Sequence, residues 1–149
     1  MDVRKYALDL KILQKEYDRR DERGRTIKYG VDWTDDPRNR YIVVRSVQMP
    51  YPRTNLKRSN VKILVPENVY DRAPGGYHFY QNVFVDPELL VMHPRKKRYV
   101  PIPRHYGADD RNWSFLCIHP NGIVQGNKNV LDFIRLLQIY LKNVDPDSY

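Results

Sequence analysis

Apolar positions recur at helical spacing near both ends of the chain. Residues 2–20 carry an apolar side chain at every third or fourth position between charged residues, which predicts an amphipathic helix. These positions are Val3, Tyr6, Leu10, Leu13 and Tyr17. Near the C-terminus, Asn129 can cap a second helix that has Asp132 in its first turn. The apolar stripe of this helix is Val130, Ile134, Leu137 and Leu141.

Between the helices, the apolar positions change to a period of two, which predicts strands. Residues 26–33 alternate Ile27, Tyr29, Val31 and Trp33 with polar or small neighbours. Short connections between consecutive strands favour an antiparallel meander of four strands. The other three strand candidates are residues 40–49, 60–65 and 77–85.

Residues 86–112 contain prolines at 87, 94, 101 and 103 and predict a long irregular loop. The expected fold is therefore α+β: an N-terminal helix, a four-stranded antiparallel meander, a long loop with the only cysteine, and a C-terminal helix packed on the sheet. A length of 149 residues fits a single domain spanning residues 1–149.

Composition indicates the cellular compartment of the protein and says less about its function. No apolar run approaches the roughly 20 residues that cross a bilayer, and the N-terminus has no signal-peptide pattern. One cysteine cannot form an internal disulfide, which agrees with a reducing compartment. We therefore expect a cytoplasmic protein with no membrane partner.

The formal charge of +8 favours acidic partners, but charge alone does not choose between nucleic acid, an anionic membrane and an acidic protein. Arg95, Lys96, Lys97 and Arg98 form the one tight basic run, which is more typical of a solvated loop than of a binding site. The charged face of the first helix is a candidate docking surface. Its cations are Arg4, Lys5, Lys11 and Lys15.

Cys117 is the residue on which the functional interpretation depends. Between Leu116 and Ile118 it is either a small buried hydrophobe or a nucleophile, and burial is the usual state of a free cysteine. In an extended segment, His119 lies on the same face as Cys117, where an imidazole can lower a thiol pKa or move protons. The four histidines are scattered, and no zinc-ligand or phosphate-loop motif is present, so we expect no metal and no cofactor.

Several segments, in this order, match those of one known family. Residues 64–74 resemble its proline-containing segment after the third strand, and residues 84–87 resemble the stretch after its fourth strand. Leu116-Cys117-Ile118 resembles its Ile-Cys-Leu, and residues 130–141 its following helix. The chain thus resembles the ubiquitin-conjugating enzyme (UBC-like) fold. Trp113, His119 and Gly126 resemble a bacterial subfamily found in ubiquitin-like and anti-phage operons.

This resemblance implies a transferase that carries a ubiquitin-like protein, or another protein C-terminus, as a thioester on Cys117. The implied partners are an activating enzyme and the conjugated protein. The family's His-Pro-Asn precedes its cysteine, whereas His119-Pro120-Asn121 follows Cys117. Candidate helper residues are therefore His119, Asn121 and, upstream, Asn112.

Two alternatives remain open. A non-catalytic member of the same fold would only bind a partner protein. A basic nucleic-acid-binding α+β domain would use residues 95–98 and exposed tyrosines for phosphate contact and stacking. No recognised nucleic-acid motif supports the latter, and we rank it last.

Overall fold

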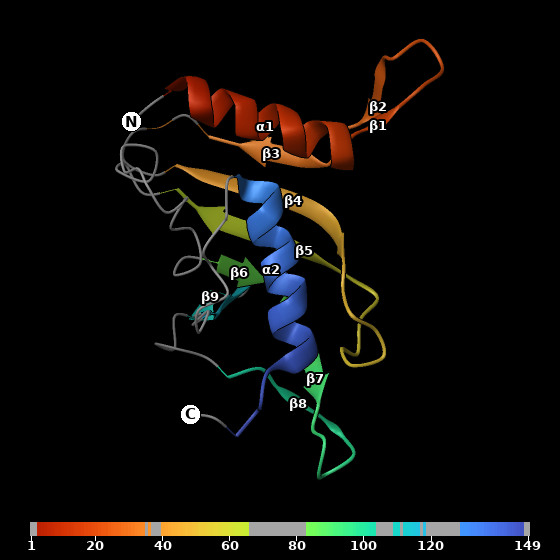
Figure 1. Cartoon of the computed structure of the whole chain (residues 1–149), viewed down its shortest axis with the longest axis vertical. Coiled ribbons are helices and arrows are strands. Elements are labelled where there is room, and N and C mark those ends of the chain that lie inside the picture. The colour runs from red at the N-terminus through yellow and green to blue at the C-terminus, as the bar shows by residue number, and fades with distance from the viewer. Residues whose placement is uncertain are drawn as a thin grey trace.

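The computed structural model has an α+β fold, with one helix near each end of the chain and antiparallel sheets between them (Figure 1). It describes residues 3–34, 36, 40–65, 83–103, 109–110, 112–116, 118 and 129–147. Helix α1 (Val3–Tyr17) lies beside the edge of the main sheet, and helix α2 (Val130–Asn143) crosses one face of it. Neither helix is both long and apolar enough to span a membrane, within the part of the chain described.

The main sheet has six strands among the described residues, and every neighbouring pair is antiparallel. The predicted sheet of four strands is therefore not confirmed. Beside β6, strand β10 is added in the register Ser114–Val85 and Phe115–Phe84. In spatial order the strands are β3 (Val31–Trp33), β4 (Tyr41–Gln48), β5 (Arg58–Leu64), β6 (Val83–Val85), β10 (Trp113–Leu116) and β9 (Asp109–Asp110).

The predicted strand over residues 26–33 is wrong as one element. Strand β2 (Thr26–Lys28) pairs with β1 (Arg19–Arg20) in a separate hairpin, and only β3 joins the main sheet. The break falls at Gly30, whose amide donates to Asp18 Oδ1 at 2.7 Å. A Cβ at Gly30 would lie 2.1 Å from the Tyr17 carbonyl oxygen, so only glycine allows this close approach to the end of α1.

The predicted irregular loop over residues 86–112 is also wrong in part. It contains a second separate hairpin, formed by β7 (Leu90–Met92) and β8 (Tyr99–Pro101), and then β9. In this hairpin's turn, His93 Nδ1 accepts the amides of Arg95 and Lys96 at 3.1 and 3.0 Å. The His93 side chain thus adds to the backbone hydrogen bonds of the turn, in which the His93 amide donates to Arg98 and the Lys97 amide donates to His93. The number of prolines in the sequence does not predict this hairpin.

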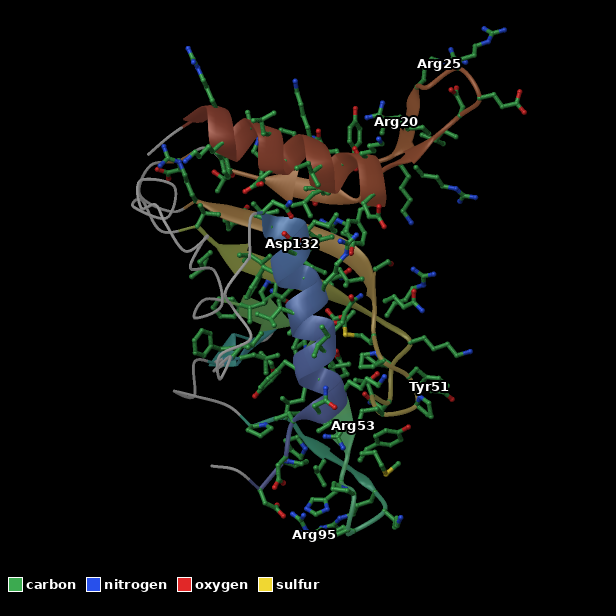
Figure 2. All side chains as sticks on the ribbon, viewed as in Figure 1. Arg20, Arg25, Tyr51, Arg53, Arg95 and Asp132 are labelled. Carbon is green, nitrogen blue, oxygen red and sulfur yellow. The ribbon has the colours of Figure 1, made fainter. Side chains whose placement is uncertain are left out.

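The core lies between α2 and the sheet. The predicted helix stripes are confirmed where they are described: Leu13 in α1 and Ile134, Leu137 and Leu141 in α2 are fully buried. The predicted cap is confirmed as well, because Asn129 Oδ1 accepts the Asp132 amide at 2.9 Å. At the other end of α2, Arg53 donates to the carbonyl oxygens of Leu141 and Val144 (Figure 2).

Candidate functional site

Strand β10 leads directly to the predicted nucleophile. Cys117, His119 and Asn121 lie outside the described residues, but the residues on both sides of Cys117 are described. Leu116, the last residue of β10, and Ile118 are each 1% exposed and belong to the core. Leu116 and Ile118 are therefore each held in the core by a buried apolar side chain.

The other face of β10 carries a cluster that we call the Lys62 cluster: Lys62, Tyr41, Phe84, Trp113 and Phe115. The Phe84 and Phe115 ring centroids are 5.2 Å apart. Lys62 Nζ lies 4.9, 5.7 and 5.9 Å from the ring centroids of Tyr41, Phe84 and Trp113. These are cation–π distances, and they tie β10 to the three strands before it.

Sequence reasoning missed the Lys62 cluster. Alternation could have found part of it, because Lys62, Phe84 and Phe115 are half-buried positions between buried neighbours in three strands. Register was also needed, since it sets Lys62 opposite Phe84 and Phe84 opposite Phe115.

Asn112 is exposed and stands at the opposite end of β10 from Leu116. Strand β10 alone, from Trp113 to Leu116, is about 10 Å long, and Asn112 precedes it. An amide at this position is outside direct hydrogen-bonding reach of a group beside Leu116.

The predicted docking cations of α1 are all exposed: Arg4, Lys5, Lys11 and Lys15. Leu8 and Ile12 lie among them with 58% and 37% of their surface exposed. Residues four apart share one helix face, so α1 presents apolar surface flanked by positive charge. Sequence reasoning missed these two residues because the apolar stripe that faces the core was sufficient to predict the helix, and apolar residues outside that stripe were not considered.

The basic run at residues 95–98 forms the turn of the β7–β8 hairpin. Arg95 Nη2 lies 2.6 Å from Asp147 Oδ2 and 3.4 Å from Asp145 Oδ1. His93, 1% exposed, contacts Asp147 through Nε2 at 2.8 Å. The hydrogen bonds from Arg95 and His93 hold the pKa of Asp147 below its usual value, and Asp147 and Asp145 raise the pKa of Arg95. Arg95 thus fastens the end of the chain to the hairpin.

No group of three or more His, Cys, Asp or Glu side chains arranged to hold a metal ion occurs among the residues that the structure describes. Comparison with known proteins gives no family for the chain. No protein-family profile matches it, and neither a curated protein nor a solved structure is detectably similar to it.

Proposed function

We propose that this chain is a cysteine-dependent acyl carrier of the ubiquitin-conjugating type. It accepts the C-terminus of a ubiquitin-like protein, or of another protein, as a thioester on Cys117 and passes it to an amine. The observation that carries the proposal is the position of the only cysteine. It directly follows a strand of the main sheet and precedes a helix with a side-chain cap.

The chemistry needs one accessible thiolate. In the first step, the Cys117 thiolate attacks the carbonyl carbon of the thioester on the activating enzyme, a C–S bond forms, and that enzyme's thiolate leaves. In the second step, an amine attacks the same carbon, a C–N bond forms, and the Cys117 thiolate leaves. The proton lost by the amine passes to a base, for which His119 is our candidate.

Hydrogen-bond donors must stabilise the oxyanion of each tetrahedral intermediate. We assign this role to the His119 and Asn121 segment in preference to Asn112, which stands at the far end of β10 from Leu116. The proposal requires a reduced thiol, which favours the cytoplasm.

The activating enzyme would dock on the exposed face of α1. This face joins Lys11 and Lys15 to Leu8 and Ile12, so it offers charge for orientation and apolar area for affinity. The same face supports the second candidate function, a non-catalytic module that binds a partner protein through α1.

A thioester assay tests the proposal. The protein is incubated with ATP, an activating enzyme and a candidate ubiquitin-like protein, and the products are separated on a non-reducing gel. We expect an adduct that dithiothreitol removes. Cys117→Ala should abolish it, and Cys117→Ser should give an oxyester that survives dithiothreitol. An adduct that persists in Cys117→Ala would refute the proposal.

Alkylation gives an independent readout, because no other cysteine competes for the reagent. A catalytic thiolate should react with iodoacetamide in the folded protein, and its rate should rise with pH through the thiol pKa. A thiol that reacts only in urea favours the non-catalytic module. Lys11→Glu with Lys15→Glu should then weaken partner binding while Cys117→Ala leaves it unchanged.

A further inference from the structure

Three adjoining pockets form one long groove beside β4, on the side of the molecule that holds the β1–β2 hairpin and one face of α2. Their volumes are about 370, 340 and 580 Å³. Gln48, Arg135 and Gln138 line the first two pockets, and Arg45 and Arg58 line the second and third. We call this surface the β4 groove.

The groove exists because β4 continues beyond its outer neighbour. Strand β3 pairs only as far as Val44, and the Arg45 amide then donates to the Gly30 carbonyl at 2.8 Å. Ser46 follows with a positive φ of 53°, which is uncommon for a residue other than glycine. The Asn60 and Arg58 side chains hold both backbone polar groups of Ser46. A bulge of this kind redirects side chains at functional sites in other proteins.

Charge in the groove is predominantly positive. Six cationic side chains line it, and two carboxylates, Glu16 and Asp18, lie among them. Arg45 is paired with Asp32, and the Asp18 carboxylate accepts the Gly30 amide. The six cations are Arg19, Lys28, Arg45, Arg58, Arg135 and Lys142.

Arg19 and Lys28 provide the clearest indication of an anionic ligand. They are direct partners in the β1–β2 ladder, and both are exposed. Like charges directly opposite each other destabilise a ladder. Neither side chain makes a hydrogen bond or ion pair with any residue in the described part of the chain. An anion bound in the third pocket, which Arg19 and Lys28 line, would relieve this repulsion.

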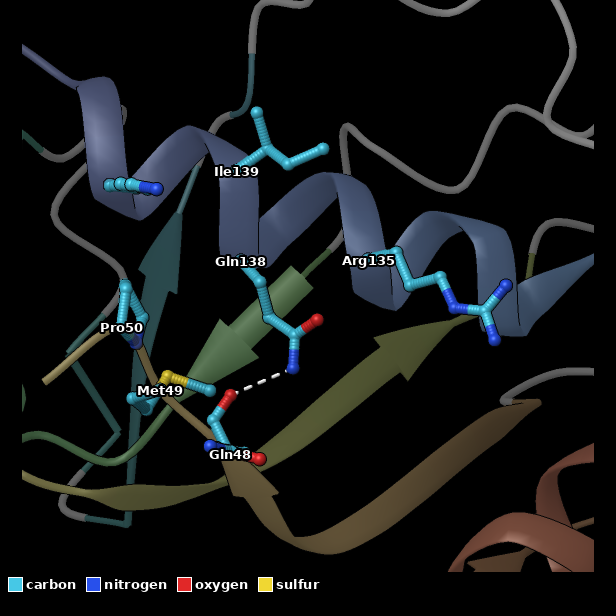
Figure 3. A pocket seen from close by; sticks show the side chains of 7 residues that line it. Gln48, Met49, Pro50, Arg135, Gln138 and Ile139 are labelled. Atoms are coloured by element: carbon cyan, nitrogen blue, oxygen red, sulfur yellow. Dashed lines mark hydrogen bonds between the residues drawn. The ribbon is translucent and has the colours of Figure 1, made fainter.

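The opposite end of the groove is less charged and partly apolar. Figure 3 shows it between α2 and the end of β4, with Met49 and Pro50 on one side and Ile139 on the helix. Gln138 Nε2 donates to the Gln48 carbonyl at 2.8 Å across it. Ile139 is 48% exposed. This end can take an apolar side chain.

We propose that the β4 groove binds an extended acidic segment of a partner protein. Carboxylates of the segment face Arg19, Lys28 and Arg58, and an apolar side chain enters the pocket beside Ile139. A peptide fits better than a nucleic acid because its charges are separated by neutral side chains. The regular phosphates of a nucleic acid would meet Glu16 and Asp18 in the groove wall. This inference goes beyond the thioester chemistry and does not involve Cys117.

Fluorescence anisotropy with defined probes tests the proposal. The first probe is a fluorescein-labelled peptide that alternates glutamate and serine and ends in leucine; the second has glutamine in place of each glutamate. We expect saturable binding of the glutamate peptide only. Lys28→Glu with Arg58→Glu should weaken it at least about fivefold at low salt. Lys28→Glu sets opposite charges across the β1–β2 ladder, so the hairpin should stay folded.

The matched control is Lys96→Glu with Arg98→Glu, which removes the same charge from the β7–β8 turn outside the groove. This variant should bind the glutamate peptide within about twofold of the unmodified protein. Equal weakening by both variants would mean that net charge alone attracts the peptide and would overturn the proposal. Absence of saturable binding would overturn it too. So would a single-stranded oligonucleotide that binds more tightly and loses affinity in the same groove variant.

Discussion

The molecule has two basic hairpins outside its main sheet, and the aspartates that pair with their arginines come from different places: from the same turn in the β1–β2 hairpin, and from residues 145 and 147 in the β7–β8 hairpin. In the β7–β8 hairpin, Arg95 meets two aspartates from the end of the chain, Asp145 and Asp147. In the β1–β2 hairpin, Asp21 accepts the Arg23 and Arg25 amides and the Arg25 side chain, and Arg20 donates to the Gly24 carbonyl, whereas Arg19 and Lys28 face each other across the ladder. Figure 2 shows Arg25 projecting outward at one end of the molecule and Arg95 at the other.

The difference shows that a run of cations in the sequence does not identify a binding surface. Residues 95–98 are the tightest basic run, yet Arg95 is used to hold the chain together. Arg19 and Lys28 belong to one hairpin and Arg58 to β5, and the fold brings all three to one groove. Whether a cation is available for a partner depends on which acids the fold sets beside it.

The largest effect that we predict concerns Arg53, which ties the β7–β8 hairpin to α2. Its guanidinium is partly buried and donates to the carbonyl oxygens of Met92, Leu141 and Val144. Arg53→Met should lower the free energy of unfolding by about 3 kcal/mol, because three carbonyl groups lose a charged donor. Urea denaturation measures this change.

The control for Arg53 comes from the β1–β2 hairpin. Arg20 Nη1 also donates to a backbone carbonyl, that of Gly24 at 3.1 Å, but the bond is exposed. Arg20→Met should change the free energy of unfolding by no more than about 0.5 kcal/mol. Equal effects of the two substitutions would show that the partly buried hydrogen bonds of Arg53 stabilise the fold no more than the exposed hydrogen bond of Arg20.

The next effect is the response of the two hairpins to acid. Hydrogen bonds from Arg95 and His93 lower the pKa of Asp147, and the backbone amide of Arg25 is the main cause of a lowered pKa at Asp21. A carboxyl with a lowered folded-state pKa stabilises the fold above its usual pKa. That contribution is lost as pH falls through the lowered value. Acid should therefore release the end of the chain from the β7–β8 hairpin.

NMR titration distinguishes the two carboxyls. Protonation of Asp147 should shift the amides of Arg95 and Lys96, because His93 holds both amides and contacts Asp147. Protonation of Asp21 should shift only the amides of its own turn. Asp147→Asn should remove the first response and leave the second unchanged. If the chemical shifts of the Arg95 and Lys96 amides do not change with the protonation of Asp147, the contact between Asp147 and the β7–β8 hairpin is not electrostatic.

Sequence patterns predicted the elements whose residues bury a regular stripe. The α1 stripe, the α2 cap at Asn129 and the long strands β4 and β5 are examples. The patterns failed where a distant contact decides the conformation. The alternation of apolar and polar residues continues across Gly30 without interruption. The break between β2 and β3 at Gly30 depends instead on its close approach to the Tyr17 carbonyl of α1. The β7–β8 turn depends on His93, whose partner Asp147 is 54 residues away.

For the functional residues too, local sequence patterns locate some features, while others depend on contacts between distant parts of the chain. A lone cysteine before a capped helix can be located from the sequence alone, and Cys117 is our candidate on that basis. The Lys62 cluster and the β4 groove cannot be located in this way. Lys62, Phe84 and Trp113 come from three strands, so their meeting depends on register. The groove depends on where β3 begins, because β4 has no β3 partner beyond Val44, and the alternation over residues 26–33 does not reveal that start.

The smallest effect that we predict is a charge reversal with opposite signs in the two hairpins. Lys28→Glu sets a glutamate opposite Arg19, so repulsion across the β1–β2 ladder becomes attraction. We expect a gain of about 0.3 kcal/mol, visible as slower hydrogen exchange of the hairpin amides. Arg95→Glu replaces two attractions by repulsions from Asp145 and Asp147, so the β7–β8 amides should exchange faster. If Lys28→Glu instead destabilises its hairpin, Arg19 and Lys28 do not repel each other there, and the strongest reason for an anion in the groove is lost.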